Sequence, residues 1–531
     1  MNSLLDSSNR SVVLAAFSAF VVVCLMLCVI TGADEDDRAL VRSDSRRLRA
    51  WQQGVAMGGD TTTVATVTVL VGMVATFGFD GIGLMLGSLV GVVLLLLLVA
   101  EPLRHHAVLT PADLLDARGS GGPGVRVSLG VVTLIVCLLL LVVQLVAVGN
   151  LAAALFGQVT PQTRIGCIIV FGTLMTAFAV TGGIRGTGVI MIAKSALAIP
   201  VLLVVAWLVL HRFGWNPARL LDSASAGAGL GRDFLKPGNY TGDGRTGALN
   251  GIGQTLGMSL ATMGMPAVLM RVISTKSPRG ARIAGRWMLS ELSVLYGALA
   301  VVGLGAAALV GPVLRDSGTG VQAFTPLLVA QALGRDGLLV AAVACVLFPT
   351  ALAAVVDMAL AAGMAVWHDV LGGFTRNDDN ASVSRWAAAL TCALAIVLSV
   401  FAVDLSLVSL SALWLTICGA ALTPVLLYAL YWPGFTARGA LWCLWGGTAL
   451  SVFLIAVSPY ASGVPGAVFP GQDFRLWDVT APAVVAGPAG FLLGWLGSVT
   501  DPQRGRRAGR AGHAPISAAA SSADRTSPTL Q

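Results

Sequence analysis

Six consecutive residues, Gly58-Gly59-Asp60-Thr61-Thr62-Thr63, interrupt an apolar segment at 54–79 that is long enough to cross a bilayer. Glycine, carboxylate and hydroxyl groups are costly inside a membrane span unless the backbone opens there to line a cavity or bind a ligand. An opened helix presents backbone carbonyls and hydroxyl groups, which suit a small solute or a cation. The run therefore predicts a binding site on a discontinuous helix.

A second interruption lies in the apolar segment 247–270. It reads Gly257-Met258-Ser259-Leu260-Ala261-Thr262-Met263-Gly264-Met265-Pro266, again with glycine, hydroxyl and proline residues. Matched interruptions in two halves of a membrane protein are typical of secondary transporters with a site near the membrane midplane. The alternative is that the small residues only allow close helix packing. We favour the transporter because the two interruptions match.

The composition predicts an all-α polytopic membrane protein. Of 531 residues, 56% are apolar and 11% are charged, whereas soluble domains have about 45–50% apolar and about 25% charged residues. The lipid bilayer is therefore an expected partner, and the net charge of +7 needs no nucleic acid. Apolar runs predict thirteen transmembrane helices, at approximately 11–32, 54–79, 82–100, 127–156, 165–182, 188–211, 247–270, 287–311, 338–367, 386–403, 406–431, 439–458 and 481–498.

The order of the spans predicts an inverted repeat. The second to sixth spans and the seventh to eleventh spans each form a group of five, and an odd-numbered group repeated in tandem inserts upside down the second time. Each repeat then begins with a discontinuous helix. The expected parts are an N-terminal extra helix and cytoplasmic loop (1–53), the first repeat (54–211), an extracytoplasmic loop (212–246), the second repeat (247–431), two C-terminal helices (432–500) and a disordered cytoplasmic tail (501–531).

Arginine and lysine residues set the expected orientation. Most of those in the loops, with Arg271 and Arg282 among them, fall in the cytoplasm when the N-terminus is outside. The preference for arginine over lysine, with abundant alanine and glycine, indicates a GC-rich bacterial genome. We therefore expect a multi-pass protein of a bacterial cytoplasmic membrane, with its N-terminus outside and its C-terminus in the cytoplasm.

The stretch Gly59-Asp60-Thr61-Thr62-Thr63-Val64-Ala65-Thr66 resembles the first core helix of the sodium:solute symporter family, in particular its cation:acetate (monocarboxylate) branch. The resemblance covers roughly residues 50 to 445. Further motifs follow in the family's order: Phe77-Gly78-Phe79-Asp80-Gly81, Glu101-Pro102-Leu103-Arg104, Leu109-Thr110-Pro111-Ala112-Asp113, Arg118, Gln144, Gly182-Gly183-Ile184-Arg185-Gly186-Thr187, Lys194, Gly264-Met265-Pro266-Ala267-Val268-Leu269-Met270-Arg271, Ala281-Arg282, His368-Asp369, Pro424 and Arg438-Gly439.

This resemblance implies a leucine-transporter-type core that moves a small solute with a cation by alternating access, and it implies no enzymatic activity. In such a family a sodium site is built from backbone carbonyls and two adjacent hydroxyl groups. Carried over, the carbonyls belong to Gly59, Thr62 and Thr350. The hydroxyl positions fall at Ala353 and Ala354, which have no side-chain oxygen. Since a bare cation needs several oxygen ligands, a sodium site here would be weak or absent.

Asp357 completes the expected cation-coupling set of Gly59, Thr62, Thr350 and Asp357. It lies within the span at 338–367, where a carboxylate costs about 2.5–3.5 kcal/mol. A desolvated carboxyl group favours its neutral form, so Asp357 could carry a proton in place of sodium. The alternative is an ion pair with a basic residue or a hydrogen bond to the backbone. The coupling ion is thus sodium or a proton, and no cofactor or other metal is expected.

The expected substrate ligands are polar or flexible residues at and near the two interruptions. They are Thr61, Thr63, Thr66, Gln144, Thr262 and Gly264. Threonine hydroxyls could donate to a carboxylate, although threonine also packs well between helices. Gln144 lies among valines and leucines, so its amide must form a hydrogen bond inside the bundle, either to the substrate or to the protein.

Three further polar residues have simpler expected roles. Asp60 caps the opened backbone or contacts the cation. Glu291 forms an ion pair, either with Arg282 or Arg286 along its own helix or with a residue of another helix, rather than taking part in coupling. Lys194 extends its side chain toward the cytoplasmic surface.

Together these features predict a secondary active transporter that moves a short monocarboxylate such as acetate with a cation. One alternative is a non-transporting paralogue that acts as a sensor or assembly partner, suggested by alanine at 353, 354 and 267. Another is a symporter of a different small metabolite such as an amino acid. A small-molecule substrate is an expected partner, and the sequence decides neither a small membrane accessory subunit nor a homo-oligomer.

Overall fold

The computed structural model describes residues 48–502, apart from gaps at 107–109, 158–159, 182–183, 241, 243, 317–323, 335–336, 372–380, 465–466 and 470, together with a few residues between 14 and 26. Every element in this part of the chain is a helix, apart from an isolated bridge between Ser462 and Phe469. The expected all-α fold is therefore confirmed. Most of the predicted span at 11–32 and of the tail at 501–531 lies outside the described residues.

The predicted spans have helical counterparts. In the described part of the chain, ten helices are long and apolar enough to cross a membrane, and the bent pair α3 (Ala50–Thr61) and α4 (Val64–Phe77) provides an eleventh span. The last predicted span corresponds to α22 (Ala483–Val499), which has 17 residues. The total of thirteen stays a prediction, because the first span is outside the described range.

The remaining helices follow in chain order. They are α5 (Phe79–Leu94), η2 (Leu95–Ala100), α6 (Glu101–His105), α7 (Pro111–Ala117), α8 (Pro123–Phe156), α9 (Pro161–Thr181), α10 (Ile184–Arg212), α11 (Pro217–Ala228), η3 (Gly231–Leu235), α12 (Gly244–Gly264), α13 (Pro266–Ile273), α14 (Pro278–Asp316), α15 (Thr325–Leu333), α16 (Leu338–Met364), η5 (Ala365–Leu371), α17 (Ala381–Phe401), α18 (Leu407–Ile417), η6 (Cys418–Leu422), α19 (Thr423–Tyr431), α20 (Ala437–Leu441), η7 (Trp442–Gly446) and α21 (Gly447–Ala456).

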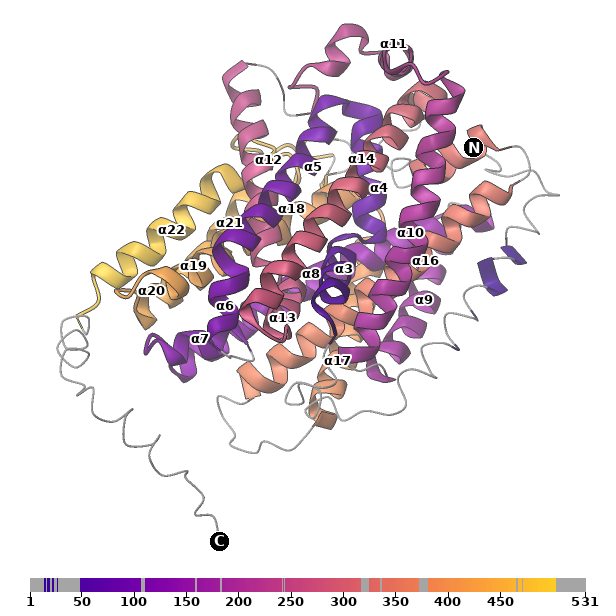
Figure 1. Ribbon diagram of the computed structural model, residues 1–531. Helices are drawn as coiled ribbons and strands as arrows, with labels where there is room; N and C mark the ends of the chain where they lie inside the picture. Colours follow the sequence, from indigo (N-terminus) through magenta and orange to yellow (C-terminus); the bar gives the residue numbers. More distant parts are fainter. Residues whose placement is uncertain are drawn as a thin grey trace.

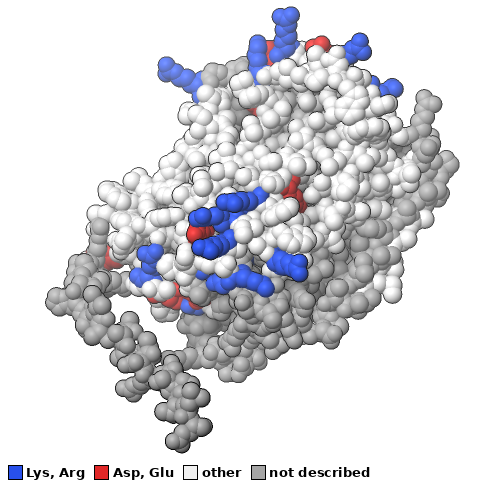
Figure 2. Space-filling model, in the orientation of Figure 1, with Lys and Arg blue, Asp and Glu red and all other residues white. Residues whose placement is uncertain are grey.

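The bundle has two polar ends. Helix α11 lies at one end and α7 at the other, and we call these ends the α11 face and the α7 face (Figure 1). In Figure 2 charged side chains gather near the α11 face and in the lower half of the molecule, and a wide surface almost free of them lies between. Such a belt suits the hydrocarbon layer of a membrane.

The first break separates α3 from α4, which are bent by 61° relative to each other. Thr62 and Thr63 have extended backbones there. The Thr63 hydroxyl accepts a hydrogen bond from the Thr66 amide (3.1 Å) and so caps α4. The hydroxyls of Thr61 and Thr62 donate to the Gly58 carbonyl, at 2.8 and 3.0 Å. Threonine hydroxyls thus pair with backbone groups at the point where the helix opens inside the bundle.

The second break separates α12 from α13. Pro266 has no N–H and cannot continue α12, so that helix ends at Gly264, and Met265 has an extended backbone. The Thr423 hydroxyl donates to the Leu260 carbonyl (2.7 Å) beside the break. A Cβ atom at Gly264 would lie 2.2 Å from Thr423 Oγ1, so the glycine allows this close approach. Both interruptions predicted from the sequence are confirmed.

Candidate functional site

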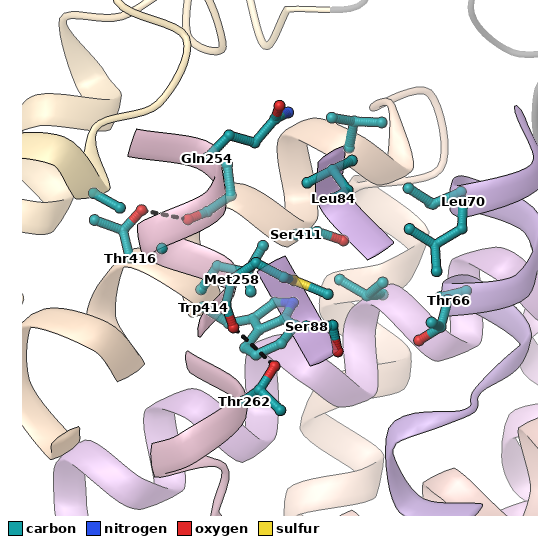
Figure 3. A pocket seen from close by; sticks show the side chains of 18 of the residues that line it. Thr66, Leu70, Leu84, Ser88, Gln254, Met258, Thr262, Ser411, Trp414 and Thr416 are labelled. Atoms are coloured by element: carbon teal, nitrogen blue, oxygen red, sulfur yellow. Dashed lines mark hydrogen bonds between the residues drawn. The ribbon is translucent and has the colours of Figure 1, made fainter. Parts of the chain in front are cut away.

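A cavity of about 130 Å³ lies against both helix breaks. Its walls come from α3 and α4, from α5, α8, α12, α14 and α18, and from the segment before α22. Figure 3 shows Thr66 and Leu70 on one side of this cavity, Gln254 and Met258 of α12 on another, and Ser88, Ser411 and Trp414 between them. The two discontinuous helices therefore share one cavity, as expected for a midplane site.

Five of the six expected substrate ligands line this cavity. They are Thr61, Thr63, Thr66, Gln144 and Thr262. The sixth, Gly264, lines a second cavity of about 40 Å³ together with Pro266, Thr110 and Asp369. The second break thus separates the large cavity from a smaller one that reaches toward α7.

Gln144 connects α8 to the start of α4. Its Nε2 atom donates to Thr63 Oγ1 (2.9 Å), and its Oε1 atom accepts from the Ala65 amide (3.4 Å). The Thr66 hydroxyl lies 2.9 Å from the Thr63 hydroxyl and donates to the Thr61 carbonyl (3.1 Å). Gln144 therefore makes the intramolecular hydrogen bond that one expectation named, while its side chain also lines the cavity.

Several lining residues were not foreseen from the sequence, and Trp414 is the most informative. Its indole Nε1–H is buried and has no hydrogen-bond partner among the described residues. The hydroxyl of Thr480, also in the lining, is likewise buried and unpaired there. A buried donor without a partner is unfavourable, so these groups are available to a ligand. No sequence pattern marks Trp414, because an aromatic residue in an apolar helix usually only packs.

The cavity wall has hydroxyl, amide and indole groups but no charge. Apolar side chains such as Val69, Leu84 and Val143 make most of the surface, and no Asp, Glu, Lys, Arg or His is found among the described lining residues. The N-terminal end of α4, where Thr63 and Thr66 lie, adds the partial positive charge of a helix N-terminus. The cavity can therefore hold a small, mostly apolar molecule with one anionic or hydrogen-bond-accepting end.

A separate group of charged side chains lies among α3, α13 and α16. Arg271 Nε is paired with Asp60 Oδ2, and Arg271 Nη2 donates to Asp357 Oδ1 at 2.7 Å. All three side chains are at most 10% exposed. The ion pair considered for Asp357 is therefore present, with a partner 86 residues away in the sequence.

Lys194 of α10 and Glu291 of α14 lie beside this group. The Lys194 ammonium donates to the Thr62 carbonyl at 2.7 Å. Glu291 is hydrogen-bonded to Ser195 and lies against the first break, since a Cβ atom at Gly58 would come 2.3 Å from its Oε2 atom. We call Asp60, Lys194, Arg271, Glu291 and Asp357 the charge cluster.

The structure corrects several expectations for these residues. Asp60 does not cap the opened backbone, because it lies within α3 and pairs with Arg271. Lys194 does not extend to the surface and is only 3% exposed. Arg271 is 5% exposed and does not belong with the loop charges.

Of the pairings expected for Glu291, the one with Arg282 along its own helix is also wrong. Arg282 pairs with Glu101 of α6 on the surface, and Glu291 points into the bundle. Spacing along one helix could not show this, since the partner of each side chain lies on another helix.

The expected cation ligands lie on the same side of the first helix break as the charge cluster. The Thr62 carbonyl accepts from Lys194, and the Gly59 carbonyl accepts from the Thr62 amide (3.1 Å). The Thr350 hydroxyl donates to the Leu347 carbonyl of its own helix (2.6 Å). Ala353 packs in one cluster with Ala56 of α3 and Met191 of α10. Residue 353 thus faces the two helices that carry Thr62 and Lys194, but it contributes no oxygen.

A hydrogen-bonded network joins α7, α8 and η5 below the smaller cavity. Arg126 donates to Asp113 (2.7 Å) and Asp116 (2.5 Å). Asp369 accepts from the Thr110 hydroxyl (2.8 Å) and lies 2.9 Å from His368. This network ties the end of the α16 segment to α7 and closes the bundle there.

Comparisons with known proteins agree with this architecture. Residues 43–447 match the sodium:solute symporter family. The "Monocarboxylic acid transporter" of Corynebacterium glutamicum is 30% identical over 501 residues, which cover 92% of this chain and 91% of that protein. The "Uncharacterized symporter YwcA" of Bacillus subtilis strain 168 is 32% identical over 464 residues, covering 85% and 87%.

Among solved structures, the outward-open, substrate-bound state of a Na+-coupled sialic acid symporter has the same fold. Its TM-score is 0.69 at 12% sequence identity, and the match covers 93% of this chain and 98% of that one. This likeness confirms the expected leucine-transporter-type fold.

Proposed function

The chain belongs to the sodium:solute symporter family, and on that premise we propose that it moves a short monocarboxylate such as acetate across the bacterial cytoplasmic membrane together with a cation. The family supports cation-coupled symport of a small solute. The choice of solute rests on the lining of the larger cavity. Its surface is mostly apolar but includes two buried hydrogen-bond donors without a partner among the described residues, the Trp414 indole N–H and the Thr480 hydroxyl.

The chemistry of a short monocarboxylate matches this lining. Its carboxylate would accept hydrogen bonds from the unpaired Trp414 indole and Thr480 hydroxyl, and its small apolar part would contact residues such as Val69 and Leu84. An amino acid would bring an ammonium group, for which the described lining offers no carboxylate. The name of the Corynebacterium glutamicum relative supports the same substrate class.

Two cavities on opposite sides of the second break favour transport over a purely sensory role. The larger contacts Thr262 and Met265, and the smaller contacts Gly264 and Pro266. A solute that leaves the larger cavity past this break would reach the smaller one. This arrangement suits alternating access, in which the two sides open in turn.

The coupling ion proposed here is the proton. Alanine at 353 and 354 leaves the expected sodium site without two of its oxygen ligands. The coupling cation is then expected to act in the region of Gly59, Thr62, Thr350 and Asp357. These residues mark that region and are not proposed as a set of sodium ligands.

We also propose that the α7 face is cytoplasmic, following the arginine distribution. An impermeant thiol reagent applied to intact cells should label Ser223→Cys in α11 and should leave Lys276→Cys unlabelled until the membrane is opened. Both are made in a cysteine-depleted background. Labelling of Lys276→Cys in sealed cells would reverse the orientation.

The substrate proposal is tested with the full chain in proteoliposomes, using radiolabelled acetate and pyruvate beside alanine and glucose. We expect an imposed gradient to drive accumulation of the two acids but not of alanine or glucose. Thr480→Val should raise KM for the acids about 10-fold or more, because the unpaired Thr480 hydroxyl is lost and a hydrogen bond to a charged group is worth about 1.5–3 kcal/mol. Thr173→Val, on the exposed side of α9, is the matched control and should leave KM unchanged.

Two results would contradict the proposal. Accumulation of alanine in place of the acids would assign a different solute. No accumulation of any compound in a panel extended to other small metabolites would favour the non-transporting alternative.

A further inference from the structure

The larger cavity extends from the two helix breaks toward the α11 face. On α4 its lining runs away from the break, from Thr66 to Leu70, and on α12 it reaches back to Gly253. Since α12 begins just after the loop that follows α11, this direction leads to the α11 face (Figure 1). The lining there also includes Tyr460 and residues 480–483, which belong to the segment between α21 and α22. This end of the cavity is therefore bounded by a segment outside the two helix breaks.

Tyr240, in the loop between η3 and α12, is attached to the turn between α4 and α5. Asp80, in the first turn of α5, accepts hydrogen bonds from the backbone amides of Tyr240 (2.7 Å) and Gly238 (3.1 Å). The Tyr240 ring packs against Phe77, the last residue of α4, with ring centroids 5.0 Å apart. Hydrogen bonds to a charged acceptor are stronger than those to a neutral one. Tyr240 is thus fixed to the helix that begins at the first break.

Tyr460 belongs to a segment that is attached to α12. The Tyr460 carbonyl accepts a hydrogen bond from the Val468 amide (3.2 Å), so the segment folds back on itself. Further along, the Thr480 amide donates to Asn250 Oδ1 of α12 (2.9 Å). The segment that carries Tyr460 is therefore fixed to the helix that ends at the second break.

A hydrogen bond between two tyrosine hydroxyls joins these two attachments. Tyr240 Oη and Tyr460 Oη lie 3.0 Å apart, and either hydroxyl can be the donor. Because Tyr240 is fixed to α4 and α5 and Tyr460 to α12, the bond connects the helices of the two breaks at the α11 end of the cavity. A neutral hydrogen bond shifts an equilibrium by about 2- to 10-fold. Such a bond can keep two loops together and still break during a transport cycle.

We propose that the hydrogen bond between Tyr240 and Tyr460 is the gate of the larger cavity toward the α11 face. With the bond formed, the loop held by Asp80 and the segment held by Asn250 meet at this end of the cavity. When α4 and α5 move away from α12, the bond breaks and the solute passes between the two tyrosines. This inference goes beyond the proposed function, because it concerns access to the cavity and holds for any solute.

A gate and a purely structural contact predict different results when the hydroxyls are removed. Phenylalanine at 240 or 460 keeps the aromatic ring and its packing, including the contact with Phe77. If the bond only stabilised the loops, access to the cavity would be unchanged and only thermal stability would fall. If the bond is the gate, the cavity should become more accessible from the α11 side.

The test measures access through a cysteine introduced at Ser411, which lines the cavity (Figure 3). The full chain, in a cysteine-depleted background, is exposed to an impermeant thiol reagent in intact cells and in inside-out vesicles. The side from which Ser223→Cys in α11 is labelled identifies the α11 face. From that side, Tyr240→Phe and Tyr460→Phe should each speed labelling of Ser411→Cys about 3-fold or more. The double variant should be no faster than either single variant, because both remove the same bond.

Two further variants control this measurement. Tyr428→Phe removes a tyrosine hydroxyl that donates to the Phe491 carbonyl (2.8 Å), and Tyr428 is not among the described lining residues, so labelling should keep its original rate. Asp80→Asn weakens the acceptor that holds the loop and leaves both tyrosines in place. It should also speed labelling, and it keeps the proposal testable if a tyrosine variant fails to fold.

Several outcomes would overturn the proposal. Unchanged labelling in both tyrosine variants, or equal acceleration in Tyr428→Phe, would reduce the tyrosine pair to packing. Acceleration only from the side opposite to α11 would place the gate elsewhere, and multiplied effects in the double variant would show that the two hydroxyls act separately. Labelling requires no transport, so failure to accumulate a monocarboxylate would remove the proposed solute and leave the gate standing.

Discussion

The substrate cavity and the charge cluster lie on the two sides of the same helix break and differ in almost every property. The cavity has space, hydroxyl groups and an unpaired indole N–H, but no charged side chain among its described lining residues. The cluster has five charged groups packed among helices. This difference predicts that recognition of the solute and control of the break depend on separate residues.

Two adjacent residues, Thr62 and Thr63, connect the two regions. The Thr62 carbonyl accepts from Lys194 of the cluster, and the Thr63 hydroxyl accepts from Gln144 of the cavity wall. A change in either region therefore reaches the other through the extended backbone at 62–63. The following variants test whether this division holds, beginning with the largest expected effect.

Arg271→Leu should have the largest effect, and it acts on the cluster. It leaves Asp60 and Asp357 buried without their shared partner, and breaking a buried ion pair costs about 3–5 kcal/mol. We expect loss of the monodisperse, folded protein in detergent, measured by size exclusion and thermal unfolding. Arg282→Leu breaks the exposed pair with Glu101 and should cost about 1 kcal/mol or less. Similar stability of the two variants would show that the cluster is not a structural unit.

Trp414→Phe should have an intermediate effect, and it acts on the cavity. An aromatic ring is kept but the unpaired indole N–H is lost, so KM for a monocarboxylate should rise about 10-fold, in line with about 1.5 kcal/mol for a hydrogen bond to a charged group. Thermal stability and dependence on the pH gradient should stay as in wild type. Trp442→Phe, at a half-exposed position on η7, is the control. An unchanged KM in Trp414→Phe would remove the indole from the site.

The double variant Ala353→Ser/Ala354→Thr should have the smallest effect. It restores the two hydroxyls of the family's sodium site while Lys194 still occupies the Thr62 carbonyl. Uptake in sodium and in choline buffer should then differ by less than about twofold, which is about 0.4 kcal/mol. Clear stimulation by sodium would mean that the lysine does not keep the ion out.

The sequence predicted the fold well because its signals are local. Apolar runs identify the spans, and the tracts at Gly58 to Thr63 and at Gly264 to Pro266 break helices through properties of the residues themselves. The lining of the cavity was partly predictable, since Thr61, Thr63, Thr66 and Thr262 lie at those breaks. Trp414 was not, because its role depends on an indole N–H that only the packed bundle leaves unpaired.

What the sequence by itself determined is therefore the membrane architecture, the two breaks, the family and the missing hydroxyls at 353 and 354. The tertiary structure decided which charges meet: Asp60 lies 211 residues from Arg271, and Lys194 lies 132 residues from Thr62. Spacing within a helix predicts neighbours three or four residues apart and nothing at such separations. The expected cap by Asp60, the expected surface position of Lys194 and the expected pair of Glu291 along its own helix failed for that reason, since a buried charge takes its partner from whichever helix packs against it.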